Sequence, residues 1–144
     1  MLAIGSDHGG LTLKREIIAY LETQKIEYKD FGTYTDESCN YPVYGEMTAR
    51  AVANGECDRG ILVCGTGIGM SIAANKVGGI RAALCMDSFC AEMTRRHNNA
   101  NILCLGGRVT GPELALRIVE IFLNTPFDGG RHKTRVDMLD AIVP

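Results

Sequence analysis

Short apolar runs alternate with amphipathic helical stretches five times along this chain of 144 residues. The runs are rich in β-forming residues and almost unbroken in apolar character, which is typical of parallel strands covered on both faces. Between the runs, apolar residues recur at a four-residue step, as they do on one face of a helix. We expect strands at residues 1–6, 26–31, 60–64, 81–85 and 101–105.

Five strand-and-helix units with short connections predict parallel pairing through right-handed crossovers, in a three-layer α/β/α sandwich. Thr110 and Glu113 have the spacing of a capping box and predict that a helix begins there. A break at residues 124–130 precedes a last helix at about 131–142. The length and the balance of apolar and charged residues fit one domain over residues 1–144.

The composition gives no reason to expect a polyanionic partner. The formal net charge is -2, so we expect no nucleic acid and no membrane partner, and an anion site only where basic side chains cluster. The first ten residues lack a basic region followed by an apolar core, which predicts a cytoplasmic protein. The six cysteines contain no Cys-x-x-Cys pair and the three histidines have no paired-ligand spacing, which predicts reduced thiols and no metal.

Glycine-rich polar segments follow three of the expected strands, at residues 6–10, 64–69 and 106–108. Ligands of open parallel sheets bind at the carboxyl ends of the strands. If the strand order is 2-1-3-4-5, the first and third strands are neighbours. Asp7, His8 and Cys64 then converge on one crevice.

Cys64 stands where the third strand meets the N-terminus of the next helix. The positive end of that helix dipole lowers a thiol pKa from about 8.5 toward neutrality, and a thiolate can accept a proton. The alternative is a buried structural cysteine, which is the commoner role.

The segment 65–69 could bind an anion or an oxyanion through its main-chain N–H groups. A tight strand-to-helix turn explains it equally well. It is no nucleotide motif, since a dinucleotide fingerprint needs a glycine where this chain has Met70, and the Gly-Lys-Ser/Thr ending of a P-loop is absent.

Two further segments have both a structural and a catalytic interpretation. Asp7 and His8, followed by two glycines, suit either a catalytic pair or a cap on the first helix. His97 lies in the polar run 95–99, at a helix end that leads into the fifth strand. It is either a histidine at the edge of the core or part of a catalytic pair that faces the crevice.

Basic side chains gather at the start of the last helix, where the helix dipole disfavours cations: Arg131, His132, Lys133 and Arg135. Arg131 and Arg135 are four residues apart and leave one face of the helix. Two guanidinium groups on one side suit a phosphate dianion, with Arg108 as a third ligand. A solvated basic face is the alternative, although it leaves the unfavourable dipole unexplained.

Taken together, these motifs resemble the type B ribose-5-phosphate isomerases, the family that also contains allose-6-phosphate and galactose-6-phosphate isomerases. The resemblance covers nearly the whole chain and lies in residues 5–10, 40–42, 64–69, 71–76, 96–101, 106–108, 130–132 and Arg135.

The resemblance implies a Rossmann-like or flavodoxin-like fold, with five parallel strands in the order 2-1-3-4-5. It also implies a homodimer, with a tetramer as a further possibility, whose two sites each take residues from both subunits. We expect the last helix at the dimer interface. The implied activity is interconversion of D-ribose 5-phosphate and D-ribulose 5-phosphate through a cis-enediol, without metal or cofactor. Allose 6-phosphate and galactose 6-phosphate are alternative substrates, and a non-catalytic phosphosugar-binding module is an alternative of another class.

The same resemblance assigns roles to individual residues. Cys64 would be the base, His97 would help to open the furanose ring, and Asp7 would assist ring opening or bind a hydroxyl. The main chain from Gly65 through Thr66, Gly67 and Ile68 to Gly69 would stabilise the enediolate oxygen. Phosphate would be bound by His8, Arg108, Arg131 and Arg135, and the sugar would be lined by Tyr41, Thr66, Ser71 and Asn98.

Overall fold

The computed structural model describes residues 1–142 as one sheet enclosed by helices. All the strand pairs are parallel, and the order is β2-β1-β3-β5-β4. The strands are β1 (Leu2–Ser6), β2 (Tyr28–Asp30), β3 (Arg59–Cys64), β4 (Ala82–Leu84) and β5 (Ile102–Gly106). The three-layer α/β/α class expected from the alternating pattern is therefore confirmed.

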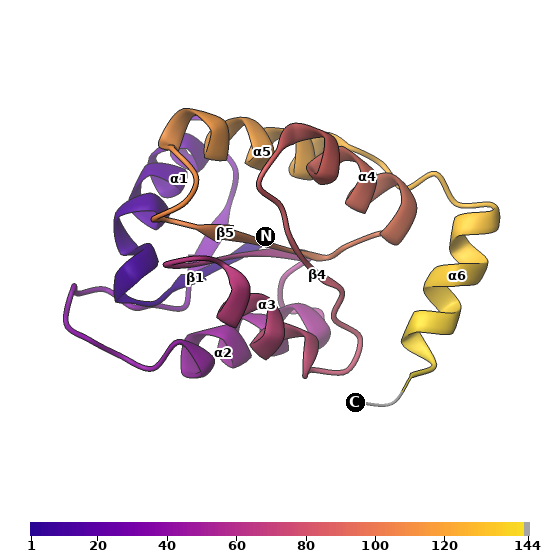
Figure 1. Cartoon of the computed structure of the whole chain (residues 1–144), viewed down its shortest axis with the longest axis horizontal. Coiled ribbons are helices and arrows are strands. Elements are labelled where there is room, and N and C mark those ends of the chain that lie inside the picture. Colours follow the sequence, from indigo (N-terminus) through magenta and orange to yellow (C-terminus); the bar gives the residue numbers. More distant parts are fainter. Residues whose placement is uncertain (143–144) are drawn as a thin grey trace.

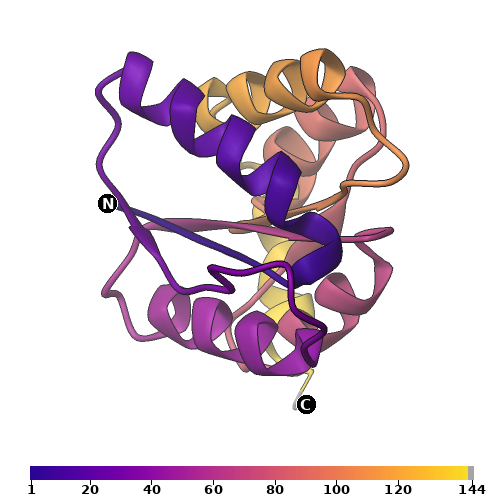
Figure 2. The same ribbon diagram turned by 90° about the vertical axis from the view of Figure 1, so that its left-hand side faces the viewer.

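Helices cover both faces of the sheet, with α1, α4 and α5 on one face and α2 and α3 on the other (Figures 1 and 2). A short 3-10 helix, η1, lies between β1 and α1. The helices are η1 (His8–Gly10), α1 (Leu11–Thr23), α2 (Tyr41–Ala53), α3 (Ile68–Asn75), α4 (Ser88–Asn98), α5 (Pro112–Asn124) and α6 (Arg131–Asp140).

The expected order of the last two strands is wrong, because β5 lies beside β3 and β4 forms the edge. All five residues of β5 are buried, whereas all three residues of β4 are partly exposed. A strand paired on both sides and covered on both faces must be wholly apolar. The wholly buried β5 therefore lies inside the sheet, and the shorter, partly exposed β4 is the edge strand.

The capping box predicted at Thr110 is also wrong. Gly111 is the N-cap of α5 and Pro112 is its first helical residue, so Glu113 falls one position too early to complete such a box. No side chain among the described residues caps this helix. Pro112 itself suits the first position, since it lacks the N–H that would have no partner there.

The core consists of two apolar clusters, one on each face of the sheet. On the first face, Ile17 of α1 and Phe122 of α5 are fully buried, and on the second face Met70 of α3 is fully buried. Each such side chain contributes roughly 1.5 to 3 kcal/mol by leaving water. The two clusters hold the helices firmly against the strands whose ends carry the polar loops.

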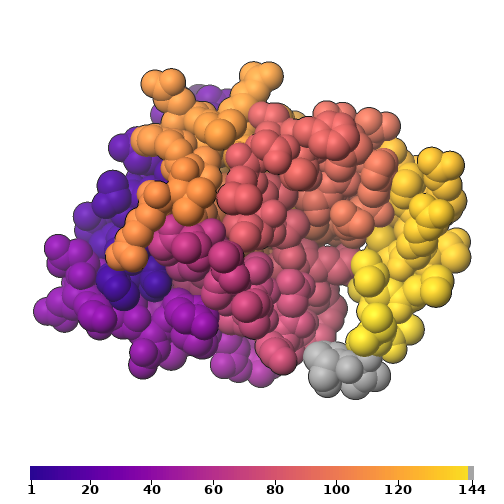
Figure 3. Space-filling view, in the orientation of Figure 1, coloured from indigo at the N-terminus to yellow at the C-terminus, as the bar shows by residue number. Residues whose placement is uncertain are grey.

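The last helix, α6, stands apart from the body of the molecule (Figures 1 and 3). It packs on α4 and is tied to the sheet by an ion pair between Arg81 and Asp140, whose nitrogen and oxygen are 2.8 Å apart. A cavity of about 530 Å³ lies between it and the edge strand β4, lined by Ala82 and Leu139 among others. Within residues 1–142, no helix has the length and apolar character needed to cross a membrane.

Candidate active site

Three polar loops meet at the carboxyl edge of the sheet, as the sequence predicted. β3 is paired with β1 and with β5, so the loops that follow these strands lie next to one another. Only glycine allows their close approach. A Cβ atom at Gly9 would lie 3.3 Å from the Gly65 nitrogen, and one at Gly107 would lie 2.9 Å from the Gly9 oxygen.

Main-chain hydrogen bonds fix the loops after β3 and β5 to each other. The Gly107 N–H donates to the Cys64 oxygen at 2.8 Å, and the Arg108 N–H donates to the Gly65 oxygen at 3.0 Å. The Arg108 side chain lies over the same loop, since a Cβ atom at Gly65 would be 3.3 Å from its Nη1. A guanidinium group is therefore held at the rim of the loop that follows Cys64.

Cys64 is the last residue of β3 and is 5% exposed. The Gly67 N–H donates to its Sγ at a nitrogen–sulfur distance of 3.1 Å. Gly67 is the N-cap of α3, with a φ of 80° that favours glycine. The sulfur therefore lies at the positive end of a helix dipole and already accepts a main-chain hydrogen bond.

The start of α3 presents main-chain N–H groups, the kind of donor that binds an anion or an oxyanion. The N–H groups in the first turn of a helix have no acceptor within the helix, and in α3 this turn includes Gly69. Thr66 Oγ1 accepts from the Ile68 N–H at 3.2 Å, and Ser71 Oγ donates to the Ile68 oxygen at 2.7 Å. The Tyr41 ring covers this turn, since a Cβ atom at Gly69 would be 2.7 Å from its Cε2.

Asp7 is the N-cap of η1, just before α1, which agrees with the capping interpretation left open by the sequence. Its Oδ1 accepts from the Gly10 N–H at 3.0 Å, and the side chain is 7% exposed. His8 is half-buried, and its Nδ1 accepts from the main-chain N–H of Cys39 at 3.2 Å. Both residues lie beside the Cys64 loop, where Gly9 touches Gly65.

The structure does not bring the remaining predicted residues to this crevice. His97 and Asn98 end α4 just before β5 begins, whereas Cys64 is aligned with Gly106 at the end of β5. The five residues of β5 span roughly 13 Å at about 3.3 Å per residue. Within one chain, His97 therefore lies at the amino ends of the strands, whereas Cys64 lies at their carboxyl ends. Helix α6 lies on the same side as His97 (Figure 1).

Arg131 and Arg135 lie on α6 with exposed side chains. Neither makes a side-chain hydrogen bond or ion pair with any residue in 1–142, whereas Lys133 between them pairs with Asp137 at 2.7 Å. No acidic side chain lies in the first turn of α6. Two guanidinium groups therefore remain free to bind an anion from outside this chain.

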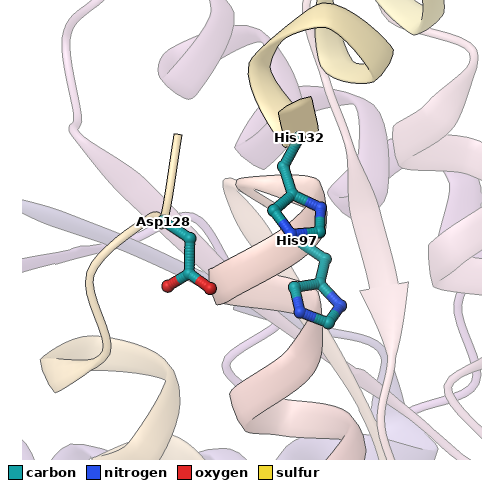
Figure 4. A group of neighbouring side chains, drawn as sticks. All are labelled: His97, Asp128 and His132. Carbon is teal, nitrogen blue, oxygen red and sulfur yellow. The ribbon is translucent and has the colours of Figure 1, made fainter. Parts of the chain in front are cut away.

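Beside these arginines lies a cluster that sequence reasoning missed: His97, Asp128 and His132 (Figure 4). The two imidazole rings are stacked, with centroids 4.2 Å apart and planes 8° from parallel. Burial and the nearby His97 and Arg131 lower the pKa of His132, while the hydrogen bond from Arg96 lowers the pKa of Asp128. One signal of this cluster is present in the sequence, since His132 stands within the basic run at the start of α6.

The donor atoms of this cluster lie within 4.8 Å of one another, which is close enough to suggest a metal site. The geometry argues against it. An imidazole nitrogen binds a metal in the plane of its ring, and the lone pairs of stacked rings lie in parallel planes that do not meet at one ion. Both Asp128 oxygens are also 3.2 Å from Arg96 Nε, which already neutralises the carboxylate.

Comparison with known proteins identifies the family. The family described as Ribose/Galactose Isomerase matches residues 2–139. The chain belongs to this family. It is 49% identical to ribose-5-phosphate isomerase B of Escherichia coli K12, over 98% of this chain and 95% of that protein. The family expected from the motifs is therefore confirmed.

Solved structures of the same family superpose closely on this one. Ribose-5-phosphate isomerase B of Clostridium thermocellum is 57% identical, with a TM-score of 0.95 over 96% of this chain and 94% of that chain. The protein of Thermotoga maritima called ribose 5-phosphate isomerase RpiB is 52% identical, with a TM-score of 0.96 over 98% and 97%. The similarity therefore covers the whole described fold, including α6.

Proposed function

We propose that this protein interconverts D-ribose 5-phosphate and D-ribulose 5-phosphate, with Cys64 as the base. One observation carries the proposal. The Cys64 sulfur accepts the Gly67 N–H at the start of α3, where the three polar loops meet. Membership of the ribose/galactose isomerase family supports the same reaction. A positioned base contributes about 10² to 10⁴ in rate, and preorganised N–H donors add stabilisation of the oxyanion.

The reaction moves two hydrogens and leaves the carbon chain intact. The Cys64 thiolate takes the proton from C2 of the open-chain aldose, and the electron pair moves to O1 to give the enediolate. Main-chain N–H groups of the segment from Gly65 to Gly69, other than those of Gly67 and Ile68, which donate to Cys64 Sγ and Thr66 Oγ1, stabilise that oxygen. The thiol then returns the proton to C1, while a proton passes from O2 to O1, so that C2 becomes the ketose carbonyl. No step in this scheme requires a metal or a redox cofactor.

The complete site requires a second copy of the chain. His97, Asn98, Arg131 and Arg135 lie at the opposite edge of the sheet from Cys64, so we propose that the partner subunit supplies them. His97 would then open the ring and the two arginines would bind phosphate together with His8 and Arg108 of the first subunit. Asp7 would assist ring opening, and Tyr41, Thr66, Ser71 and Asn98 would line the sugar.

Exposed apolar side chains support such a homodimer. On α2, Val43 and Met47 are exposed one turn apart, and on the adjoining α3, Ile68 and Ile72 are exposed in the same way. Contiguous apolar patches of this kind mark interaction surfaces. The patch borders the Cys64 loop, since Ile68 is the first residue of α3. The position of α6 at the dimer interface remains a prediction, and so does the formation of a tetramer.

The six cysteines are free thiols, as in proteins of reducing compartments. This supports the cytoplasmic location expected from the sequence, which stays a prediction.

The test is turnover of ribose, allose and galactose phosphates in excess chelator, with binding measured by calorimetry. We expect ribose 5-phosphate to be converted. Cys64→Ala should lower kcat by about 10² to 10⁴ and leave binding nearly intact. Cys90→Ala, at an exposed cysteine, is the matched control and should remain active. Binding of all three sugars without turnover would favour a binding module, and full activity of Cys64→Ala would remove Cys64 as the base.

A further inference from the structure

The loop between β2 and α2 contacts the ring of His8 through Cys39. Residues 34–38 of this loop are exposed, but Cys39 is half-buried. Its main-chain N–H donates to His8 Nδ1 at 3.2 Å, across 31 positions of sequence. Its Sγ lies 3.7 Å from the same nitrogen. The exposed stretch of this loop is therefore followed by a contact with a site residue.

This contact determines where the ring proton of His8 lies. A neutral imidazole has one nitrogen that donates and one that accepts. A main-chain N–H can only donate, so the nitrogen that receives it must carry the lone pair. Nδ1 of His8 is consequently unprotonated, and the proton is on Nε2.

The backbone that carries His8 is fixed independently of its ring. Asp7 caps η1 through the Gly10 N–H, and Gly9 packs on the Gly65 nitrogen. These contacts fix the main chain on both sides of His8 but leave the ring free to turn. Among the described residues, the hydrogen bonds of the His8 ring are those made by Cys39.

We propose that the main-chain N–H of Cys39 positions His8, holding its ring as the Nε2–H tautomer so that Nε2–H is the donor offered to the substrate phosphate. The phosphate role rests on the proposed function, whereas the tautomer does not. A donor of fixed direction complements the charged Arg108. Cys39 is a positioning residue, because it acts through His8 and does not touch the substrate.

The thiol of Cys39 offers a competing explanation, because it lies close to the same lone pair. One lone pair accepts one strong hydrogen bond, and a thiol is a weak donor. Substitutions at Cys39 distinguish the main-chain N–H from the thiol as the group that positions His8. Cys39→Ala removes the thiol and keeps the N–H, whereas Cys39→Pro removes the N–H, since proline has none. Ser38→Pro is the control for a stiffened loop, because the Ser38 N–H makes no main-chain hydrogen bond within residues 1–142.

The direct test is ¹⁵N NMR of the histidine rings at about pH 8, above the ordinary imidazole pKa of about 6.5, without substrate. We expect an unprotonated Nδ1 on His8 and a scalar coupling from the Cys39 amide to it across the hydrogen bond. Both should persist in Cys39→Ala, and the coupling should be absent in Cys39→Pro. A protonated Nδ1 in the wild type, or loss of the coupling in Cys39→Ala, would overturn the proposal.

The kinetic test asks whether the position of the His8 ring matters for binding of the substrate phosphate. For ribose 5-phosphate, Cys39→Pro should raise KM roughly threefold to tenfold, because a ring that is free to turn loses part of its hydrogen bond to the phosphate, with a smaller change in kcat. Ser38→Pro should keep the wild-type KM, and an equal rise there would refute the positioning role. A wild type that turns over no sugar phosphate would end the proposed function, while the NMR result would still decide the tautomer.

Discussion

The imidazole ring of His97 lies face to face with that of His132, 4.2 Å away between centroids. The two rings come from different elements, since His97 is near the end of α4 and His132 is the second residue of α6. Arg131 and Arg135 lie on the same helix, and Asp128 is the one carboxylate of the cluster. Two protonated rings stacked in this way would repel each other, so the stack favours at most one charge.

The first prediction concerns the titration of His132. Burial, His97 and Arg131 lower its pKa, and Asp128 only partly opposes them. The folded chain therefore binds fewer protons here than the unfolded chain. The contribution of His132 to the free energy of unfolding is therefore present above about pH 6.5, the pKa of the ring in the unfolded chain. It is lost as the pH falls from there through the lower pKa of the ring in the folded chain. NMR titration of the ring should show His132 titrating below 6.5.

A substitution checks the cause of that shift. His97→Gln removes one positive neighbour and should move the pKa of His132 upward, whereas Arg50→Gln, on the remote α2, should leave it unchanged. A His132 that titrates at or above the ordinary value in the wild type would show that Asp128 dominates the cluster instead.

A second prediction compares two glycines of similar backbone conformation. Gly67 has a φ of 80° and Gly55 a φ of 76°, so alanine at either position suffers the same strain, roughly 1 to 2 kcal/mol. Only Gly67 is enclosed, since a Cβ atom there would lie 2.5 Å from Leu84 Cδ1 and 2.9 Å from the Leu105 carbonyl carbon. Urea unfolding should therefore show Gly67→Ala less stable than Gly55→Ala. Equal losses would mean that the Cys64 loop can shift freely.

A third prediction concerns thiol reactivity. Burial raises the pKa of Cys85 to about 12 and also raises the pKa of Cys104. Cys90 is exposed, although Asp87 raises its pKa as well. At pH 8 an alkylating reagent should modify Cys90 in the folded chain and leave Cys85 and Cys104 untouched until the chain unfolds, as peptide mass spectrometry would record. Early labelling of Cys104 would reveal opening of the central strands.

The fold could be predicted because strand and helix patterns are local. The fully buried residues of β1, β3 and β5 stand out as apolar runs, and the glycines that follow them mark the loops. The order of β4 and β5 could not be predicted, because both runs are apolar in sequence. Which of the two lies at the edge depends on packing against α3 and α4, which no local pattern records.

The predicted site residues fall into two groups, and the structure brings only the first group together within one chain. Asp7, His8, Cys64 and Arg108 meet because each lies at or just after the carboxyl end of a strand. His97 precedes β5, so the chain direction alone places it at the other edge of the sheet, and this signal was available in the sequence. The stacking of His97 on His132 could not be predicted from the sequence, because it depends on how α6 packs on α4 after the break at residues 124–130.

The fourth prediction tests whether each site takes residues from two subunits. Cys64→Ala and His97→Asn should each be nearly inactive alone. If the proposed dimer is symmetric, a mixed dimer has one site with both substitutions and one site with neither. Random exchange gives about half mixed dimers, so the mixture should recover about a quarter of the wild-type activity.

The control for that experiment is a pair of substitutions on the same edge of the sheet. Cys64→Ala mixed with Arg108→Ala should recover no activity, because both residues come from one subunit and every site then carries a lesion. Recovery with the first pair and not with the second would locate His97 across the interface. If the first pair recovers nothing while both proteins remain folded and exchange subunits, His97 does not act at the partner's Cys64, and the shared site is wrong.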